Sequence, residues 1–294
     1  MAKADLQGAD NNLAKAGLKL DNGILSQADY LRFQAGKAGK ELALQQAQTA
    51  LQISLQDFAN YLGASELLMP SALNLENEQD LIAILGSYDQ SQTRRLTDTA
   101  LQMLAGRNLN LQMLDKSVEL SERAYRIAKA SFLPTVMLTG SRKYSENGID
   151  RYDFEASNQL ILSASLPILP GWGNYAATRK AREEARQMKL EALSAMDGIR
   201  LGVQSAVLHL VGKARQVQST GLTLSYTEQL YAQLTERFNL NMISASELLD
   251  AELMLSGARI ANTGARYDYL NARRNLMRAL VLDDNRELEQ LIIQ

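Results

Sequence analysis

The sequence contains no cysteine, a single histidine and only four prolines in 294 residues. Without cysteine the chain forms neither disulfide bonds nor thiolate metal sites, although this fixes no compartment, because many secreted bacterial proteins also lack cysteine. The net charge of −2 argues against the basic surface expected of a nucleic-acid-binding domain. With 46% apolar residues, the composition is that of an ordered protein of one or two domains.

Long hydrophobic runs are also missing. Residues 1–20 are too polar for a signal peptide, and no window approaches the ~20 apolar residues that a transmembrane helix needs. These absences leave a membrane β-barrel open, because barrel strands alternate in polarity and escape a hydropathy scan.

No constellation for catalysis or for a cofactor is present. His209 is the only histidine and has no second ligand nearby, so neither a metal site nor a Ser-His-Asp triad is expected. The run from Gly36 to Lys40 lacks the spacing of a phosphate-binding loop. We therefore predict a protein that is not an enzyme and has no cofactor or metal.

The chain is dominated by helical periodicity. Helices are expected over residues 24–62, 90–130, 174–238 and 244–280, where Gly63 ends the first and Ser244 or Ser246 caps the last. The predicted apolar seam of the last helix is Leu249, Leu253, Ser256, Ile260, Thr263, Tyr267 and Leu270. Helices of this length need partners along their whole length, which predicts coiled-coil packing.

One segment has a different period. Residues 135–144 and 152–166 alternate in polarity, with Pro134 before them and an Asn-Gly turn signal between them. The predicted apolar face of the second strand is Ala156, Leu160, Leu162, Ala164 and Leu166. This pattern indicates a single β-hairpin.

The chain also contains an internal repeat. With an offset of 218 residues, the distance from Ile24 to Met242, two helix reversals align, and Gly23 falls on Asn241. Glycine and asparagine are the residues that most readily take the left-handed conformation that closes a helix. A repeat of this length indicates a duplicated helical hairpin.

These features together resemble the outer-membrane efflux factor family, the TolC-like channel proteins. The resemblance is carried by AKASFLPTVMLTGS (128–141), LSASLPILPGWGNYAATRKAREEARQ (162–187) and residues 237–280, with residues 18–52 as the first-repeat counterpart. It implies a mainly α fold of long antiparallel coiled-coil hairpins, in which one β-hairpin contributes to a transmembrane β-barrel of a trimer. It also implies a passive exit duct of a tripartite efflux or type I secretion system, located in the outer membrane and extending into the periplasm.

The resemblance divides the chain into six parts. They are a first-repeat hairpin (1–63, tip near 21–25), a connection (64–89), a helix leading to the barrel (90–133), a transmembrane β-hairpin (134–173), a second-repeat hairpin (174–281, tip near 239–244) and a tail (282–294). The expected partners are two further copies of the chain, a periplasmic adaptor, an inner-membrane pump and outer-membrane lipid. Because the chain begins inside the first repeat, we expect an N-terminally truncated form without the leading helix, the first strand pair and the signal peptide.

Two acidic residues follow the second tip. Glu247 and Asp250 are three residues apart and share a helix face, and the resemblance implies that in a trimer they form carboxylate rings that narrow the pore. An equally open interpretation is that both acids favour the positive end of the helix dipole.

Two further sets of residues have two interpretations each. The tips place apolar side chains at helix reversals, for which the resemblance implies adaptor docking; the alternative is burial against neighbouring helices. The tip residues are Asn22, Gly23, Ile24, Leu25, Asn241, Met242 and Ile243. Aromatic residues flank the β segment, as membrane-interface girdles or as ordinary packing of a soluble sheet; they are Phe132, Tyr144, Tyr152, Phe154, Trp172 and Tyr175. The competing function is a soluble coiled-coil scaffold, which would bury the apolar face of the hairpin against its own helices.

Overall fold

In a computed structural model of the chain, the structure describes residues 1–64, 66, 69–70, 78–146, 154–166, 168 and 171–293. These residues form mostly long helices and one two-stranded antiparallel sheet. They belong to two compact units, Met1–Leu101 with Val203–Gln294, and Gln102–Gly202. Within the described part of the chain, no helix has both the length and the apolar character that crossing a membrane requires.

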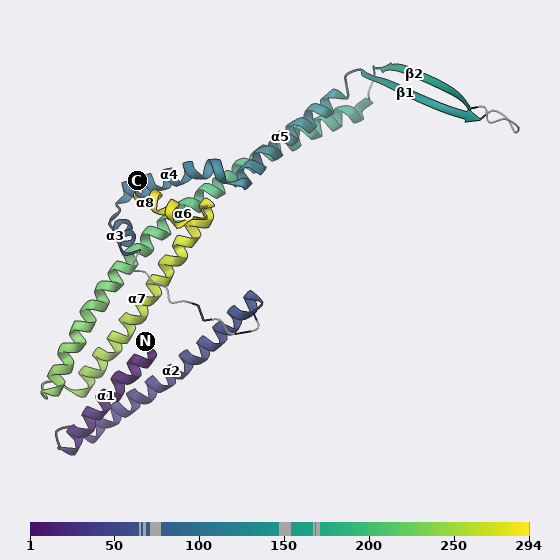
Figure 1. Cartoon of the computed structure of the whole chain (residues 1–294). Helices are drawn as coiled ribbons and strands as arrows, with labels where there is room; N and C mark the ends of the chain where they lie inside the picture. Colours follow the sequence, from purple (N-terminus) through teal and green to yellow (C-terminus); the bar gives the residue numbers. More distant parts are fainter. Residues whose placement is uncertain are drawn as a thin grey trace. The chain divides into compact units, whose positions relative to one another are not determined.

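Two helical hairpins form the long part of the first unit (Figure 1). The first consists of α1 (Ala2–Asp21) and α2 (Gln27–Leu62), and the second of the end of α6 (Gly171–Asn239) and α7 (Ala245–Leu280). No proline interrupts α6 over its 69 residues, and its internal glycines do not break it, as predicted. Ion pairs join the elements, including Lys213 with Asp268 at 2.7 Å and Arg259 with Asp5 at 3.2 Å.

The repeat extends to the far ends of these hairpins. Helices α2 and α7 have 36 residues each, and both their first and last residues differ by the same 218 positions. Each helix ends on a left-handed residue, Gly63 (φ 64°) and its equivalent Val281 (φ 55°). Valine is strained in this region because its Cβ approaches the following carbonyl oxygen. The second repeat therefore keeps the left-handed backbone conformation at Val281, although it lacks the glycine that favours this conformation.

Helix α1 is fixed by a buried asparagine. Asn12 lies between the buried Ala9 and Ala16 on one face of α1, and small residues there let neighbouring helices approach closely. Its Nδ2 donates to the hydroxyl of Tyr231 on α6 (2.9 Å) and to Oε2 of Glu252 on α7 (3.0 Å). A buried amide with both of these acceptors fixes the position of α1 along both helices.

The apolar seam predicted for α7 is wrong in its position. Leu253, Ile260 and Tyr267 are exposed, and the buried side chains lie on a neighbouring face. The buried face consists of Ala245, Leu248, Ala251, Leu255, Asn262, Ala265, Tyr269, Ala272, Arg273, Leu276 and Leu280. The prediction favoured the large side chains, whereas the alanines of the buried face allow the closer helix approach. Large apolar side chains of α2 are exposed as well, at Leu51, Phe58 and Leu62.

Two short helices occur where only a connection and a tail were expected. Helices α3 (Gln79–Ser87) and α8 (Asn285–Ile293) each bury one apolar face and contact one another. The carbonyl oxygen of Ile82 accepts from Nε2 of Gln218 on α6 at 3.2 Å. A Cβ at Gly86 would lie 2.3 Å from the side-chain amide of Gln218, so a larger residue here would displace the end of that flexible side chain. Nine residues are too few for a periodic pattern to stand out in the sequence.

A buried polar cluster lies beside these short helices. Arg273 forms an ion pair with Glu78, and both side chains are almost fully buried. The hydroxyl of Tyr269 has no hydrogen-bond partner among the described protein groups. Burial, and then the charge of Glu289, raise the pKa of Tyr269 to about 12.

The second unit contains α5 (Leu109–Ala130), the first part of α6, and strands β1 (Thr135–Glu146) and β2 (Phe154–Ser165). The helix expected over residues 90–133 is interrupted at Asn108, between α4 (Gln90–Arg107) and α5. The Asn108 side chain accepts hydrogen bonds from the amides of Asn110 (2.8 Å) and Leu111 (3.3 Å). Asparagine favours such a cap over a helix interior, because its side chain competes for backbone groups.

Candidate functional site

The two helical tips have the same backbone hydrogen bonds. At the first tip the amides of Asn22, Gly23 and Ile24 donate to the carbonyl oxygens of Leu18, Leu20 and Lys19 at 3.2, 2.9 and 2.8 Å. At the second tip, 218 residues later, the amides of Leu240, Asn241 and Met242 donate to Glu236, Phe238 and Arg237 at 3.1, 3.0 and 2.9 Å. The reversals predicted from the repeat are therefore the same structural motif.

A left-handed residue closes each reversal. Gly23 has φ 70° and Asn241 has φ 61°, which confirms the prediction made for this pair. Asparagine tolerates this conformation better than other residues with a side chain, because its short polar side chain bonds locally.

The helix after each tip begins with the same kind of cap. Ser26 Oγ accepts from the amide of Asp29 at 3.1 Å, and Ser244 Oγ accepts from the amide of Glu247 at 3.3 Å. Glu247 Oε2 accepts in turn from the Ser244 amide, which completes a capping box. Ser244 is therefore the cap, and Ser246 only lies beside it at 3.0 Å.

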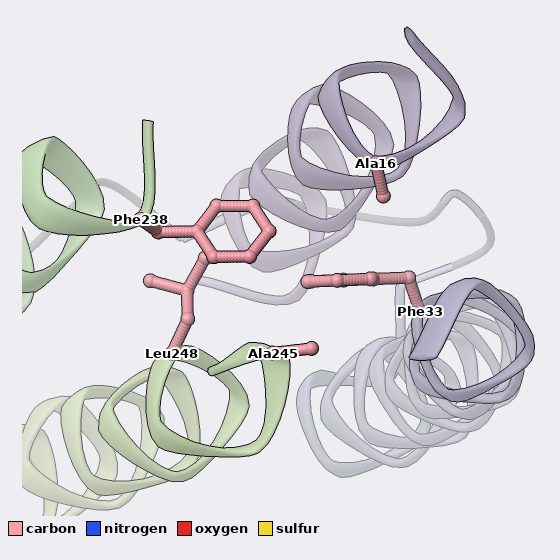
Figure 2. Close-up of a cluster of buried hydrophobic side chains, with 5 residues drawn as sticks. All are labelled: Ala16, Phe33, Phe238, Ala245 and Leu248. Atoms are coloured by element: carbon pink, nitrogen blue, oxygen red, sulfur yellow. The ribbon is translucent and has the colours of Figure 1, made fainter. Parts of the chain in front are cut away.

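A shared apolar cluster joins the tips (Figure 2). The rings of Phe33 and Phe238 face one another with centroids 5.5 Å apart and an interplanar angle of 54°. Ala16, Ala245 and Leu248 enclose them, so all four long helices of the unit contribute. Because tilted aromatic pairs in a dry cluster are favourable, the tips of the two repeats fold against one another.

Lys19 adds a polar link between the tips. Its Nζ donates to the carbonyl oxygens of Phe238 and Asn239 and to Oδ1 of Asn241, and lies 4.5 Å from the Phe238 ring centroid. The ammonium thus caps the C-terminus of α6, where carbonyl groups lack helical partners and the dipole favours a cation. Burial lowers the pKa of Lys19. Its position in the last turn of α1 gives no sign in the sequence of acceptors on another helix, so this role of Lys19 is visible only in the structure.

The apolar residues of the tips separate into two pairs. Ile24 and Met242 are equivalent in the repeat, and they are 54% and 69% exposed. Leu25 and Ile243, the next equivalent pair, are half-buried against the aromatic cluster. Asn22 instead bonds the Leu18 carbonyl oxygen at 2.7 Å. Burial against neighbouring helices thus accounts for Leu25 and Ile243. Of the four apolar residues predicted for docking, only Ile24 and Met242 are exposed.

Glu247 and Asp250 are both exposed on α7, and each directly precedes a buried residue, Leu248 and Ala251. Glu247 occupies the third helical position and takes part in the cap described above. Asp250 forms no ion pair with any described residue. The geometry of Glu247 fits the helix-dipole interpretation, and the exposure of both acids leaves them available to other ligands.

The register of the β-hairpin aligns its apolar positions. Val136, Leu138 and Gly140 pair with Ala164, Leu162 and Leu160, so they share one face. The opposite face is mainly polar; its pairs include Thr139 with Ile161, Ser141 with Gln159, and Lys143 with Ser157. On both faces of the hairpin, every strand residue whose side chain the structure describes is exposed. The hairpin therefore presents an apolar face that no described helix covers.

The flanking aromatic residues lie at the two ends of the strands. Phe132, Trp172 and Tyr175 are exposed beside the helices, and Trp172 is 90% exposed. Tyr144 lies toward the other end, where Arg142 stacks at 5.1 Å from its ring. The Phe154 backbone begins β2, but its side chain and all of Tyr152 lie outside the described residues. Tyr144 lies ten positions after Pro134, about 33 Å along the strand at ~3.3 Å per residue.

Among the described residues, no group of three or more potential ligands is placed to hold a metal ion.

Comparison with known proteins gives two results. Residues 100–281 match the protein family described as Outer membrane efflux protein, whereas the comparison with curated proteins gives no match. Among solved structures, the fold is similar to the outer membrane protein VceC of Vibrio cholerae (16% identity, TM-score 0.69, 95% of this chain and 64% of that one). It is also similar to the CmeC outer membrane channel of Campylobacter jejuni (13%, 0.67, 99% and 61%) and to the open state of the MtrE outer membrane channel of Neisseria gonorrhoeae (14%, 0.65, 95% and 62%). The chain thus spans less than two thirds of the length of these structures, with which it shares its fold.

Proposed function

We propose that this chain, which belongs to the outer membrane efflux protein family, is part of an outer-membrane channel through which exported compounds leave the cell. The protein acts as a passive duct, and its strands lie in the bilayer while its helices extend into the periplasm. Three copies surround the pore.

The exposed apolar face of the β-hairpin carries this proposal. Strands of 12 residues span about 40 Å at ~3.4 Å per residue, which suffices to cross a ~30 Å hydrocarbon core when tilted. Leu138, Leu160 and Leu162 are 64%, 75% and 71% exposed on that face. A soluble coiled-coil scaffold would cover these side chains with its own helices, because exposing them to water costs about 25 cal/mol per Å² of apolar surface.

Cell fractionation tests the location. We expect the full-length gene product in the membrane fraction, resistant to carbonate extraction and released only by detergent. Recovery from the soluble fraction without detergent would refute the channel.

The exposed tips are proposed as the surface that a periplasmic adaptor contacts, in a system driven by an inner-membrane pump. Ile24 and Met242 support this, because they are apolar, exposed and equivalent in the two repeats. Their replacement by serine should reduce site-specific cross-linking to the adaptor. Serine at the exposed Leu253 on α7, remote from the tips in sequence, is the control and should leave it unchanged.

Glu247 and Asp250 are proposed as rings of carboxylates that favour cations in the pore. Glu247→Gln with Asp250→Asn should lower the ratio of cation to anion permeability in single-channel recordings. The fold should persist, because glutamine also serves at this position of a capping box. Asp57→Asn, which removes one exposed charge from α2, is the control. Unchanged selectivity would leave only the role at the helix N-terminus.

A further inference from the structure

A groove of about 940 Å³ lies in the second unit between the last turns of α5 and the first turns of α6. A hydrogen bond joins the two helices here, in which Thr178 Oγ1 donates to the carbonyl oxygen of Ala128 at 3.1 Å. Phe132 and Leu133 line it immediately before β1 begins, so the groove lies at the helical end of the strands. Figure 1 shows the strands continuing from the end of α5.

The polar lining of this groove is predominantly cationic. Arg126 and Lys129 come from α5, Arg179 and Arg182 come from α6, and Glu183 is the one acid among the lining residues. Each basic pair is spaced three residues apart and so shares a helix face. Lys129, Arg179 and Arg182 form no ion pair with a described residue, and Arg126 has only an exposed contact of 3.9 Å with Glu122. Positive charge is therefore available to a ligand.

The rest of the lining is amphipathic. Tyr125, Phe132 and Tyr175 place rings beside the cations, and Leu133 adds an aliphatic surface. Arginine binds phosphate oxygens in bidentate geometry, and aromatic rings with a polar end prefer the boundary between hydrocarbon and water. An anionic phospholipid presents a phosphate and acyl chains in this arrangement, whereas a free anion would leave the rings unused.

We propose that this groove binds the headgroup of an anionic phospholipid in the leaflet on the helical side of the membrane. This rests on the proposed function, because strands that cross the bilayer place the groove at headgroup level. Basic residues near an anionic surface each strengthen binding about fivefold, so loss of two should weaken it about 25-fold.

The test uses the full-length protein in neutral detergent micelles. Binding of phosphatidylglycerol and of phosphatidylcholine is measured by native mass spectrometry. The variant Arg179→Gln with Arg182→Gln is compared with Arg186→Gln with Lys189→Gln. The control pair lies seven residues further along α6, is likewise exposed, and does not line the groove. Both variants remove two positive charges from neighbouring turns of one helix.

We expect the wild type and the control variant to prefer phosphatidylglycerol, and the groove variant to lose this preference by about 25-fold. An equal loss of the preference for phosphatidylglycerol in both variants, or equal binding of the two lipids by the wild type, would overturn the proposal. Displacement of the lipid by an equal concentration of inorganic phosphate would also overturn it, because it would indicate a site for free anions.

Membrane fractionation of the same variants separates this inference from the function on which it rests. A wild-type protein absent from membranes refutes the channel. A protein that is embedded in membranes but shows no lipid preference refutes only the lipid site.

Discussion

Replacement of Lys19 by methionine should loosen the second tip while the hairpins remain folded. Methionine keeps the length and apolar character of the side chain but removes the donors that reach the carbonyl oxygens of Phe238 and Asn239. These carbonyl groups at the end of α6 would then depend on water, and the ammonium over the Phe238 ring would be lost.

The magnitude follows from the contacts. A charged donor contributes about 1.5–3 kcal/mol through its hydrogen bonds, a cation at a helix C-terminus about 0.3–1 kcal/mol, and a cation–π contact about 0.5–1 kcal/mol. One ammonium makes all of these contacts, so they do not add, and the burial that lowers its pKa opposes them. We expect a net loss of about 2 kcal/mol, which corresponds to about a 30-fold change in the opening equilibrium.

Hydrogen exchange of the full-length protein measures this opening. The amides of Asn241 and Met242, which donate within the second tip, should exchange about 30-fold faster in Lys19→Met. Lys15→Met is the matched control, since Lys15 lies one turn earlier on α1, is half-buried, and has no hydrogen bond or ion pair within the described residues. Unchanged exchange in Lys19→Met, or an equal increase in both variants, would refute the reasoning.

Three further predictions concern stability, measured by urea unfolding. Val281→Gly should stabilise the folded protein by about 0.5–1 kcal/mol, because relieving the left-handed valine gains ~1–2 kcal/mol, more than the entropic cost of glycine. The equivalent change Gly63→Val should lower the free energy of unfolding. A less stable Val281→Gly variant or a more stable Gly63→Val variant would contradict this. Tyr269→Phe should stabilise by about 1 kcal/mol, because the buried hydroxyl has no partner among the described protein groups. The pKa of Tyr269 is about 12 in the folded state and ~10 in the unfolded state, so the unfolded state loses this proton first as the pH rises. The free energy of unfolding of the wild type should therefore fall by up to about 2–3 kcal/mol between pH 10 and pH 12. An equal fall in the phenylalanine variant would contradict this. Phe33→Ala and Phe238→Ala should each lower the free energy of unfolding by about 3–5 kcal/mol. In the double variant the loss should differ from the sum of the two single losses by about 0.5–1.5 kcal/mol. Strict additivity would argue against the ring contact.

The helix reversals were predictable because their signals are local. A left-handed residue, a serine cap and the acid three positions later all lie within a few residues of one another, and duplication made each signal visible twice. Gly23 and Asn241 were found in this way. The break at Asn108 has the same local cause, but it was missed because the apolar periodicity continues through it.

The candidate sites were predictable only in part. The strands and their apolar face could be predicted because apolar and polar residues alternate with a period of two, a pattern that a short stretch of sequence already shows. The division of the tips into exposed Ile24 and half-buried Leu25 depends on the aromatic cluster, which side chains distant in sequence complete. The basic groove joins residues about fifty positions apart, so no window of sequence contains it.

The sequence by itself determined where the chain reverses at the two tips, where α2 and α7 end and which strand positions are apolar, because each depends on the conformational preferences of a few adjacent residues. The tertiary structure decided which face of α7 is buried and what Lys19 bonds. Helix α7 has apolar side chains on two faces, and only the shape and spacing of α1, α2 and α6 select the face with alanines. A lysine at a helix end meets water or a neighbouring carbonyl group according to where the next helix lies, and that placement comes from packing along the whole length of the hairpins.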